Sequence, residues 1–436
     1  MSRFLFGSNP FSGHVRPGLP IARELVARGH EVVWYTGGRF RAMVEATGAR
    51  HVAPTAAVDF DEADLEATFP GRAATRAGIP QLKFDVRHLF LDPVVDQVHD
   101  MQALLAEESF DAIVVESTFL AGAYLSELTG IDVAVYGITP LTGRSRDTAP
   151  TGLGMTPLSG PLGRVRNRVL HDLIEKVVFG PEQRRAQSVR AALGLPRSDV
   201  FFFDTGLLTV PLFIHGTVPE FEYPRTDLPS TVHFVGALLP GTPGTAPLPA
   251  WWDELDGDRP VVLVTQGTVK VDPDHLLHPA IEGLAGEDVL VVGTTGGAEP
   301  AELLRRHDAA NVRLERFIPF EDLLPYVDVV VTNGGYGGTQ QALAHGIPVV
   351  VAGVTEGKIE IAARVRWAGV GIDLRTDSAS AEQVRTAVRR VLADPSYRDR
   401  ARNLAERYAA HDAARSAADL VEGLVRTSGR EHAVAR

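Results

Sequence analysis

A glycine-rich stretch in the second half of the chain has the composition of a phosphate-binding turn. The segment from Asn333 to Gly338 reads NGGYGG, with four glycines in five positions, and it follows the β-branched run at 329–331. Such a run is typical of a strand buried on both faces, and a helical pattern continues at 339–345. Glycine accepts the positive φ angles of a sharp turn, and the free N–H groups at a helix N-terminus attract anions. The stretch therefore predicts a phosphate site, although a tight connection without a ligand is the simpler alternative.

His14 and Glu116 have the residue types and positions of a base and its carboxylate partner. His14 follows a predicted first strand at 3–6 and precedes a helical pattern at 17–27, and Glu116 ends another predicted strand at 111–115. Ligands of open α/β sheets bind beyond the carboxyl ends of the strands. A carboxylate that is hydrogen-bonded to a histidine orients the ring and stabilises its protonated form. The simpler alternatives are a solvated loop histidine and an acid at a helix N-terminus.

Both candidate sites belong to regions in which short apolar strands alternate with helices. Strand patterns recur at 31–35 and 133–138 in the first region, and at 261–265 and 289–294 in the second. This alternation predicts parallel sheets with helices on both faces. We therefore expect two doubly wound, Rossmann-like α/β domains that face a central cleft.

The boundary between the two regions is indicated by composition. Residues 238–252 are rich in proline and glycine and form the best linker candidate. A chain of 436 residues also exceeds the size that one hydrophobic core usually supports. We predict an N-terminal domain at 1–237 and a C-terminal domain at 253–410.

The composition argues against several kinds of protein. The net charge of −12 argues against nucleic acid as the main partner, and the absence of cysteine excludes disulfides, thiolate catalysis and cysteine-bound metals. No apolar run approaches the roughly 18 residues of a membrane span, and the first residues lack the apolar core of a signal peptide. We expect a cytoplasmic protein without an integral membrane segment. The sequence leaves open whether it is a monomer or a homodimer.

Two stretches taken together resemble the nucleotide-sugar-dependent glycosyltransferases of family 1, in particular bacterial enzymes that glycosylate lipophilic natural products. They are GHVRPGLPIARELVARGHEV at 13–32 and TNGGYGGTQQALAHGIPVVVAG at 332–353. The resemblance covers nearly the whole chain, with the motifs in the right order and at the right separation. It implies the GT-B fold. The first domain, joined by a C-terminal helix at 411–427, would bind the acceptor, and the second would bind the nucleotide-sugar donor.

For the first domain, the resemblance implies that His14 deprotonates the acceptor hydroxyl. Glu116 would be its partner, at a position where the family usually has aspartate. A hydroxyl is a poor nucleophile until a base takes its proton. A histidine can do this near neutral pH, and a carboxylate stabilises the imidazolium that forms. Ser12 and Gly13 are expected to lie near the donor phosphates.

Several positions of the implied donor site depart from the family pattern. Asn333 replaces a histidine that donates to the diphosphate, and its amide can donate but carries no positive charge. Gln341 stands where the family has an acidic residue for the ribose hydroxyls. Residues 357–358 replace the Asp-Gln pair that grips the sugar, and Glu356 or Glu360 could supply the acid from a neighbouring position.

The remaining donor contacts follow from the same resemblance. Phe317 would stack on the nucleotide base, and Phe320 replaces a glutamine that contacts the nucleotide. Thr268 corresponds to a hydroxyl residue that contacts phosphate. The complete predicted donor site comprises Ser12, Gly13, Thr268, Phe317, Ile318, Asn333, Gly334, Gly335, Gly337, Gly338, Gln341, Glu356, Gly357 and Lys358.

The predicted function is an inverting glycosyl transfer that needs no metal and no other cofactor. The sugar would move from a UDP- or dTDP-sugar to a hydroxyl of a lipophilic small molecule, and the helix N-terminus would stabilise the departing diphosphate. We interpret the D-x-D strings at 59–61, 256–258 and 272–274 as surface turns. Two alternatives stay open: a sugar-nucleotide epimerase on the same fold, which would need no acceptor, and a non-catalytic helper protein with a degenerate donor site.

Overall fold

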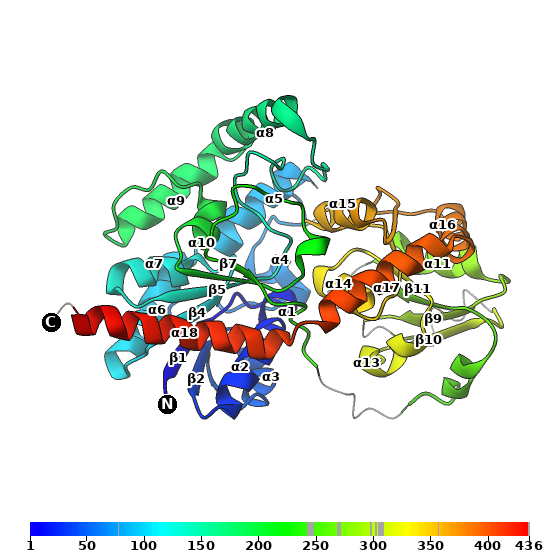
Figure 1. The fold of residues 1–436 in the computed structure, drawn as a ribbon, viewed down its shortest axis with the longest axis horizontal. Helices are drawn as coiled ribbons and strands as arrows, with labels where there is room; N and C mark the ends of the chain where they lie inside the picture. The colour runs from blue at the N-terminus through cyan, green and yellow to red at the C-terminus, as the bar shows by residue number, and fades with distance from the viewer. Residues whose placement is uncertain are drawn as a thin grey trace.

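The chain folds into two α/β domains that lie side by side, each built on a parallel sheet (Figure 1). A computed structural model describes residues 1–76, 78–241, 248–267, 272–296, 299–300, 303, 309–355 and 357–434, with the backbone alone at 428–434. The predicted fold class of two doubly wound domains is confirmed. No helix within these residues is long and apolar enough to cross a bilayer.

The first sheet has seven strands in the order β3-β2-β1-β4-β5-β6-β7. They are β1 (Arg3–Gly7), β2 (Glu31–Tyr35), β3 (Arg50–Val52), β4 (Ala112–Glu116), β5 (Val133–Gly137), β6 (Leu212–His215) and β7 (Val232–Phe234). Side chains alternate between two apolar layers: Leu5 packs on one face of the sheet, and Phe4 and Phe6 pack on the other. Burial of both faces explains the short, almost wholly apolar strands.

The second sheet has six parallel strands in the order β10-β9-β8-β11-β12-β13. They are β8 (Val261–Thr265), β9 (Leu290–Thr294), β10 (Val312–Glu315), β11 (Val329–Thr332), β12 (Val349–Val351) and β13 (Gly371–Asp373). Here too the two faces are apolar, with Leu263 in one layer and Val262 and Val264 in the other.

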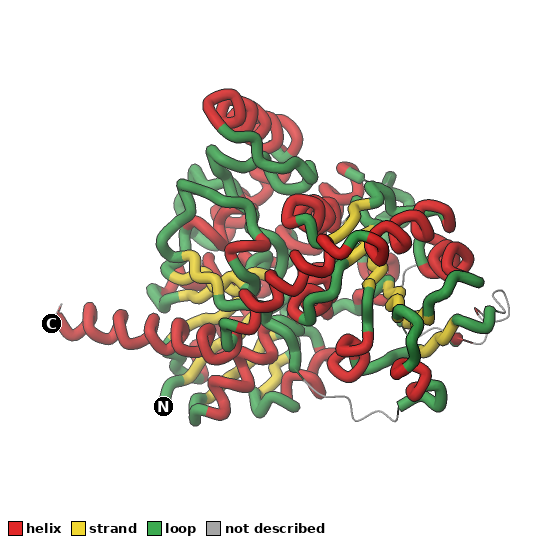
Figure 2. Tube along the Cα trace, turned by 45° about the vertical axis from the view of Figure 1, so that its right-hand side comes forward, coloured by secondary structure: helices red, strands yellow, loops and turns green. Residues whose placement is uncertain are grey.

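Helices cover both faces of each sheet (Figures 1 and 2). In the first half of the chain they are α1 (Ser12–Val15), α2 (Gly18–Ala27), α3 (Arg41–Glu45), α4 (Leu65–Thr68), α5 (Ile79–Asp85), α6 (Val94–Glu107), α7 (Leu120–Thr129), α8 (Gly160–Leu173), α9 (Gly180–Ala192) and α10 (Thr205–Leu208). The second half contains α11 (Leu277–Leu284), α13 (Phe320–Leu323), α14 (Tyr336–Ala344), α15 (Lys358–Ala368), α16 (Ala381–Ala393), α17 (Pro395–Ala409) and α18 (Ala413–Val434). Two π-type segments, Val86–Leu91 and Ile174–Val178, extend α5 and α8.

Each domain receives a piece of chain from the other half of the sequence. Helix α18 runs back across the first domain (Figure 1), where Ala417 and Val421 join the apolar layer beside α2. Conversely, the segment between β6 and β7 places Val218 and Phe221 in the apolar core of the second domain. Residues 242–247 of the predicted linker lie outside the described residues.

Candidate active site

The structure brings His14 and Glu116 into contact at the carboxyl ends of two neighbouring strands. β1 and β4 pair in parallel, with Gly7 opposite Val115, so the segments that follow them leave the sheet side by side. His14 lies in the short helix α1, between the predicted strand at 3–6 and the predicted helix at 17–27. Its Nδ1 atom is 2.9 Å from Oε1 of Glu116. Sheet topology alone therefore joins two side chains that are 102 positions apart in the sequence.

Glu116 is buried and has four hydrogen-bond donors. Besides His14, its carboxylate accepts from the amide of Asn9 at 2.8 Å and from the hydroxyl and backbone N–H of Thr118 at 2.7 and 2.5 Å. Burial by itself raises the pKa of Glu116, but His14 and the Thr118 donors outweigh burial and hold this pKa below its usual value. An ionised carboxylate can only accept, so Nδ1 of His14 carries the proton and Nε2 keeps its lone pair for a substrate.

Asn9 is a candidate site residue that the sequence analysis missed. Its side chain is buried, its Nδ2 donates to Glu116, and its Oδ1 accepts from Nε2 of Gln97 on α6 at 3.2 Å. Gln97 thereby fixes which end of the Asn9 amide faces the carboxylate. The position of Asn9, just beyond the carboxyl end of β1, is a signal that could have identified it. Gln97 lies in the middle of a helix and offers no such signal.

Replacing Asn9 with alanine should lower kcat about tenfold, because the buried carboxylate of Glu116 loses one of its donors and is held less firmly against His14. A hydrogen bond to a charged group is worth about 1.5–3 kcal/mol, and about 1.4 kcal/mol corresponds to a tenfold change in rate. Steady-state kinetics with saturating acceptor measures the change, and thermal unfolding shows whether the variant stays folded.

The matched variant for Asn9→Ala is Gln97→Ala. It removes the bond that orients the Asn9 amide and leaves Asn9 itself in place, so it should lower kcat by a smaller factor. A loss of rate in Asn9→Ala that is matched by an equal loss of folded protein would show that Asn9 supports the fold and does not position the pair.

Four phenylalanine rings form an apolar wall next to His14. The ring centroid of Phe11 is 4.9 Å from that of the imidazole, and Phe90 stacks on it at 6.0 Å with an interplanar angle of 12°. Phe60 and Phe69 continue the wall beyond Phe11, with successive centroid distances of 5.1 and 5.2 Å. Such faces favour stacking with an aromatic or flat apolar ligand. Three of these rings come from a region without a clear periodic pattern, so the sequence did not reveal the wall.

Ser12 and Gly13 begin α1, but Ser12 is buried and Gly13 is exposed. The backbone N–H and the hydroxyl of Ser12 both donate hydrogen bonds to the carboxylate of Glu62, the N–H at 2.9 Å. A phosphate contact through the Ser12 hydroxyl would have to replace this bond to Glu62, a residue 50 positions away. Gly13 is exposed, with no atom within 4 Å of the place where a Cβ would stand, so its backbone is open to a ligand.

The glycine turn is shorter than predicted because α14 begins at Tyr336, three residues before the predicted start at Thr339. Gly334 has a φ of 85°, and a Cβ there would lie 2.8 Å from Val351, so this position requires glycine. Gly337 and Gly338 belong to the first helical turn and are exposed, with open space at the place of a Cβ. The N–H groups of a first helical turn have no partner within the helix. They can therefore bind an anion here.

Residues 357–358 lie beside this turn. Gly357 precedes α15 with a φ of 80°, and Lys358 is the first residue of that helix. A Cβ on Gly334 would be only 3.5 Å from the Cβ of Lys358, which places the lysine backbone next to the glycine turn. Asn333 uses its Nδ2 to donate to the backbone carbonyl of Gln266, and this bond anchors the turn to the end of β8. A helix N-terminus, a glycine turn and a lysine thus meet at one edge of the second sheet.

The residues expected around the nucleotide are divided between surface and core. Phe317 is 65% exposed, so its ring is available for stacking. The side chain of Ile318 is buried in the apolar core of the second domain, so the predicted contact with the donor could come only from its backbone. Gln341 donates through Nε2 to Oε1 of Glu321 on α13 at 3.3 Å. The pair at this position therefore contains a carboxylate, although Gln341 itself does not.

Three other predicted positions give no further support to the nucleotide-sugar site. Thr268 and Glu356 lie outside the described residues. Glu360, the second candidate for the missing acid, is buried and accepts the backbone N–H groups of Gly152 and Gly154 at 2.9 and 2.8 Å. Since its carboxylate bridges the two domains, Glu360 is not free to grip a sugar.

Comparison with known proteins identifies the family. Residues 295–424 match the model of the erythromycin biosynthesis protein CIII-like C-terminal domain. The chain is 49% identical over 424 residues to 4'-demethylrebeccamycin synthase of Lentzea aerocolonigenes, across 97% of this chain and 100% of that protein. The chain belongs to the natural-product glycosyltransferases of family 1. This glycosyltransferase is also 37% identical to UDP-glycosyltransferase 2 of Phaeomoniella chlamydospora, across 95% and 94% of the two chains.

A solved structure supports the fold assignment of the enzyme. The calicheamicin glycosyltransferase CalG4 matches it with a TM-score of 0.74 at 22% sequence identity, covering 98% of each chain. The resemblance inferred from the two motifs is thus confirmed, together with the GT-B fold. These relatives support glycosyltransferase activity over the two alternatives that the sequence left open, the epimerase and the non-catalytic helper protein.

Proposed function

We propose that this glycosyltransferase inverts the anomeric centre of a UDP- or dTDP-sugar, using His14 to deprotonate a hydroxyl of a lipophilic acceptor. The observation that carries the proposal is the 2.9 Å contact between Nδ1 of His14 and the buried carboxylate of Glu116. It leaves Nε2 as the only basic atom of the ring, next to the wall formed by Phe11, Phe60, Phe69 and Phe90.

The reaction follows from this arrangement as a single displacement. Nε2 of His14 takes the acceptor proton while the acceptor oxygen forms a bond to the anomeric carbon. The bond between that carbon and the diphosphate oxygen breaks, and its electron pair leaves with the diphosphate. Because the nucleophile enters opposite the leaving group, the configuration inverts. Glu116 stabilises the imidazolium that results.

The second domain offers a way to stabilise the leaving group without a metal. Negative charge develops on the diphosphate, and the first turn of α14 presents the open N–H groups of Gly337 and Gly338. Lys358 adds a cation beside the same turn. Preorganised donors of this kind stabilise developing charge because they need no rearrangement during the reaction.

The relatives support the choice of substrates. The 49% identical relative carries the name of a rebeccamycin-type synthase, and the 37% identical one is named a UDP-glycosyltransferase. The aromatic wall next to His14 suits a flat, apolar acceptor. We therefore place UDP-sugars first among the donors and flat, apolar natural products first among the acceptors.

The test is the release of nucleoside diphosphate with UDP- or dTDP-glucose and a panel of lipophilic hydroxylated acceptors, in the presence of EDTA. Wild type should release diphosphate only with an acceptor. His14→Ala should lose roughly 100- to 10,000-fold in rate. The matched control is His30→Ala, because His30 forms a similar His–Glu pair outside the candidate site. Its Nε2 atom lies 2.8 Å from Oε1 of Glu422 on α18. This variant should behave like wild type.

Each other outcome of this test has a defined meaning. Release without acceptor that is equal in wild type and His14→Ala would reject His14 as the base. Activity that EDTA abolishes and a divalent metal restores would reject the metal-independent mechanism. Product with retained anomeric configuration, seen by NMR, would reject direct displacement.

A further inference from the structure

Glu62 fastens the loop at 55–62 to the start of α1, the helix that carries His14. Its buried carboxylate accepts the backbone N–H of Ser12 through Oε2, at 2.9 Å, and the Ser12 hydroxyl through Oε1. Arg39 supplies a nearby cation, with Nη1 3.4 Å from Oε1 of Glu62. Both carboxylate oxygens of this acid are therefore engaged at the first residue of α1.

The two segments that Glu62 joins also meet through aromatic rings. Phe11 directly precedes Ser12, and Phe60 lies two positions before Glu62. The two rings meet edge to face, with their centroids 5.1 Å apart. Phe60 is buried, whereas its two ring neighbours, Phe11 and Phe69, are only half-buried. Phe60 thus supports the partly exposed rings of the aromatic wall, and the hydrogen bonds of Glu62 hold this support against α1.

Other contacts of the loop at 55–62 lead away from α1. Asp59 accepts the backbone N–H of Gly38 at 2.8 Å, and Asp100 on α6 accepts the backbone N–H groups of the first three residues of the loop. In the part of the chain that the structure describes, Glu62 is the one residue of this loop with a hydrogen bond to α1. Loss of the Glu62 carboxylate should therefore release the wall from α1 and leave the loop attached to the domain.

We propose that Glu62 is a positioning residue for the acceptor, a role that rests on the proposed function of the His14 site. Successive centroids from His14 through Phe11 and Phe60 to Phe69 are 4.9, 5.1 and 5.2 Å apart, so the wall extends beyond the reach of a single ring. Glu62 fixes the far part of this wall relative to the base. It thereby favours flat acceptors of several rings over acceptors of one ring, which contact only the part next to the imidazole.

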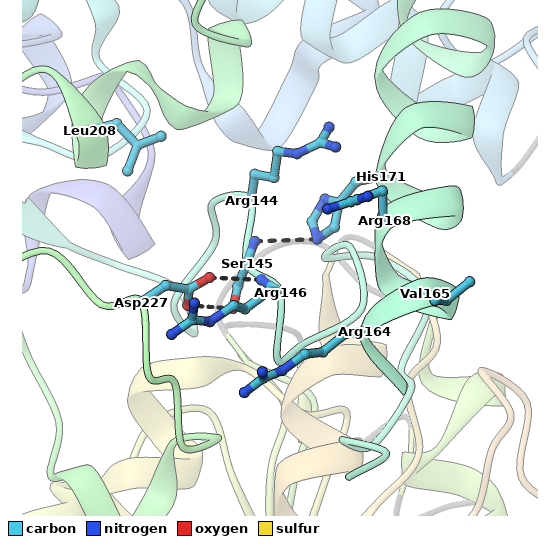
Figure 3. Close-up of a pocket in the computed structure, with 9 residues that line it drawn as sticks. All are labelled: Arg144, Ser145, Arg146, Arg164, Val165, Arg168, His171, Leu208 and Asp227. Carbon is cyan, nitrogen blue, oxygen red and sulfur yellow. Dashed lines mark hydrogen bonds between the residues drawn. The ribbon is translucent and has the colours of Figure 1, made fainter. Parts of the chain in front are cut away.

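The cavity beside α8 offers a small molecule a second place to bind (Figure 3). It has a volume of about 520 Å³, and its lining includes four arginines. Arg144 in this lining is paired with Asp172 at 3.0 Å and with Glu175 at 2.8 Å. None of the nine residues drawn in Figure 3 belongs to the aromatic wall. A flat, apolar acceptor stacks on aromatic faces, so we place it at the wall and not in this charged cavity.

Calorimetric titration of the full chain tests the role of Glu62 with two probes, a three-ring hydroxyanthraquinone and the single-ring 4-nitrophenol. Wild type should bind the three-ring probe more tightly. Glu62→Ala should weaken the binding of the three-ring probe about tenfold and leave that of the single-ring probe unchanged, because only the far part of the wall is released. A merely structural role would reduce the amount of binding-competent protein for both probes and change neither dissociation constant.

Three further variants control this comparison. Glu62→Gln can accept the N–H of Ser12 and donate to the Ser12 hydroxyl, so it should keep the wild-type preference. Asp64→Ala is the matched control, because Asp64 is an exposed acid of the same region whose carboxylate caps its own helix, α4. Leu208→Ala alters the lining of the cavity in Figure 3. The last two variants should bind both probes like wild type.

Phe60→Leu tests whether Glu62 acts through the wall. It should weaken the binding of the three-ring probe, and adding Glu62→Ala should weaken it no further. The proposal would be overturned by wild type without a preference for the three-ring probe, by Glu62→Ala with an unchanged preference, or by effects of the two substitutions that multiply. Weaker binding in Leu208→Ala would also overturn it, because the probe would then lie in the cavity beside α8. Calorimetry needs no turnover, so a negative diphosphate-release test would reject the proposed reaction independently of this result.

Discussion

Replacing Glu116 with glutamine should lower kcat about a thousandfold and leave the KM for the donor nearly unchanged. Glutamine has the size of the native residue but lacks its charge, so the imidazolium formed at His14 loses its stabilisation. The new amide can also donate to Nδ1 of His14. The neutral ring would then carry its proton on Nε2, the atom that has to accept the proton of the acceptor.

The matched control for Glu116→Gln is Glu116→Asp. It keeps the negative charge and introduces the residue that the family usually has, but its shorter arm lengthens a contact that is now 2.9 Å. We expect a rate between those of wild type and the glutamine variant. Steady-state kinetics with saturating acceptor measures both, and thermal unfolding shows whether the buried site stays folded. Glutamine activity within tenfold of wild type would mean that Glu116 is not the partner of the base.

The contact between His14 and Glu116 could be predicted because it depends only on strand order. Both residues follow strands that end at the same edge of a parallel sheet, and β1 and β4 are neighbours in that sheet. The glycine turn could be predicted for the same reason, since it follows a strand and precedes a helix. Patterns of this kind carry local information that the sequence displays directly.

The sequence was least informative about residues whose surroundings are set by partners far away in the chain. Ile318 follows Phe317 directly, yet it is turned into the core of the second domain. Ser12 is hydrogen-bonded to Glu62, which lies 50 positions away, and Glu360 is hydrogen-bonded to a loop 208 positions away. Helix α14 begins three residues early because Gly337 and Gly338 are helical, despite their low helix propensity. Tertiary packing decides each of these cases.

A buried cluster of charged residues joins the two domains at the position of Glu360. Glu222, in the first half of the chain, accepts from Nε and Nη2 of Arg364 on α15, both at 2.8 Å, and from His215 at 3.0 Å. Arg364 also donates to Glu360 at 3.1 Å. All four side chains are buried. One arginine therefore neutralises two carboxylates that belong to opposite sides of the domain interface.

Replacing Arg364 with methionine should destabilise the enzyme by about 3–5 kcal/mol, because it leaves two carboxylates buried without a cation. Denaturant unfolding measures the change, and separate transitions of the two domains are analysed individually. Arg389→Met is the matched control. Arg389 binds Glu287 with a similar pair of bonds, at 2.7 and 2.8 Å, but at the exposed surface, so its loss should leave stability nearly unchanged. Equal stability of the two variants would contradict a role for the cluster.

The cluster also predicts a pH dependence of stability. Burial raises the pKa of Glu222, but Arg364 and His215 outweigh it and hold that pKa well below the ordinary value. A carboxyl group with a lowered pKa stabilises the fold fully above its unfolded pKa, about 4.3, and this contribution is lost as the pH falls further. The wild type should therefore keep the stabilising contribution of Glu222 unchanged near neutral pH and lose it below about pH 4, which denaturant unfolding across this range measures.

Arg364→Met should also affect the donor site, since Arg364 and Lys358 lie on one helix. Arg364 fixes α15 against the first domain, and the N-terminus of α15 carries Gly357 and Lys358 beside the glycine turn. When the contact between Arg364 and Glu222 is lost, Lys358 is no longer held in place relative to His14 in the first domain. At temperatures well below unfolding, Arg364→Met should raise the KM for the donor several-fold and leave the KM for the acceptor unchanged. A rise in both constants would instead indicate a general loss of packing, and no rise would show that the cluster supports stability alone.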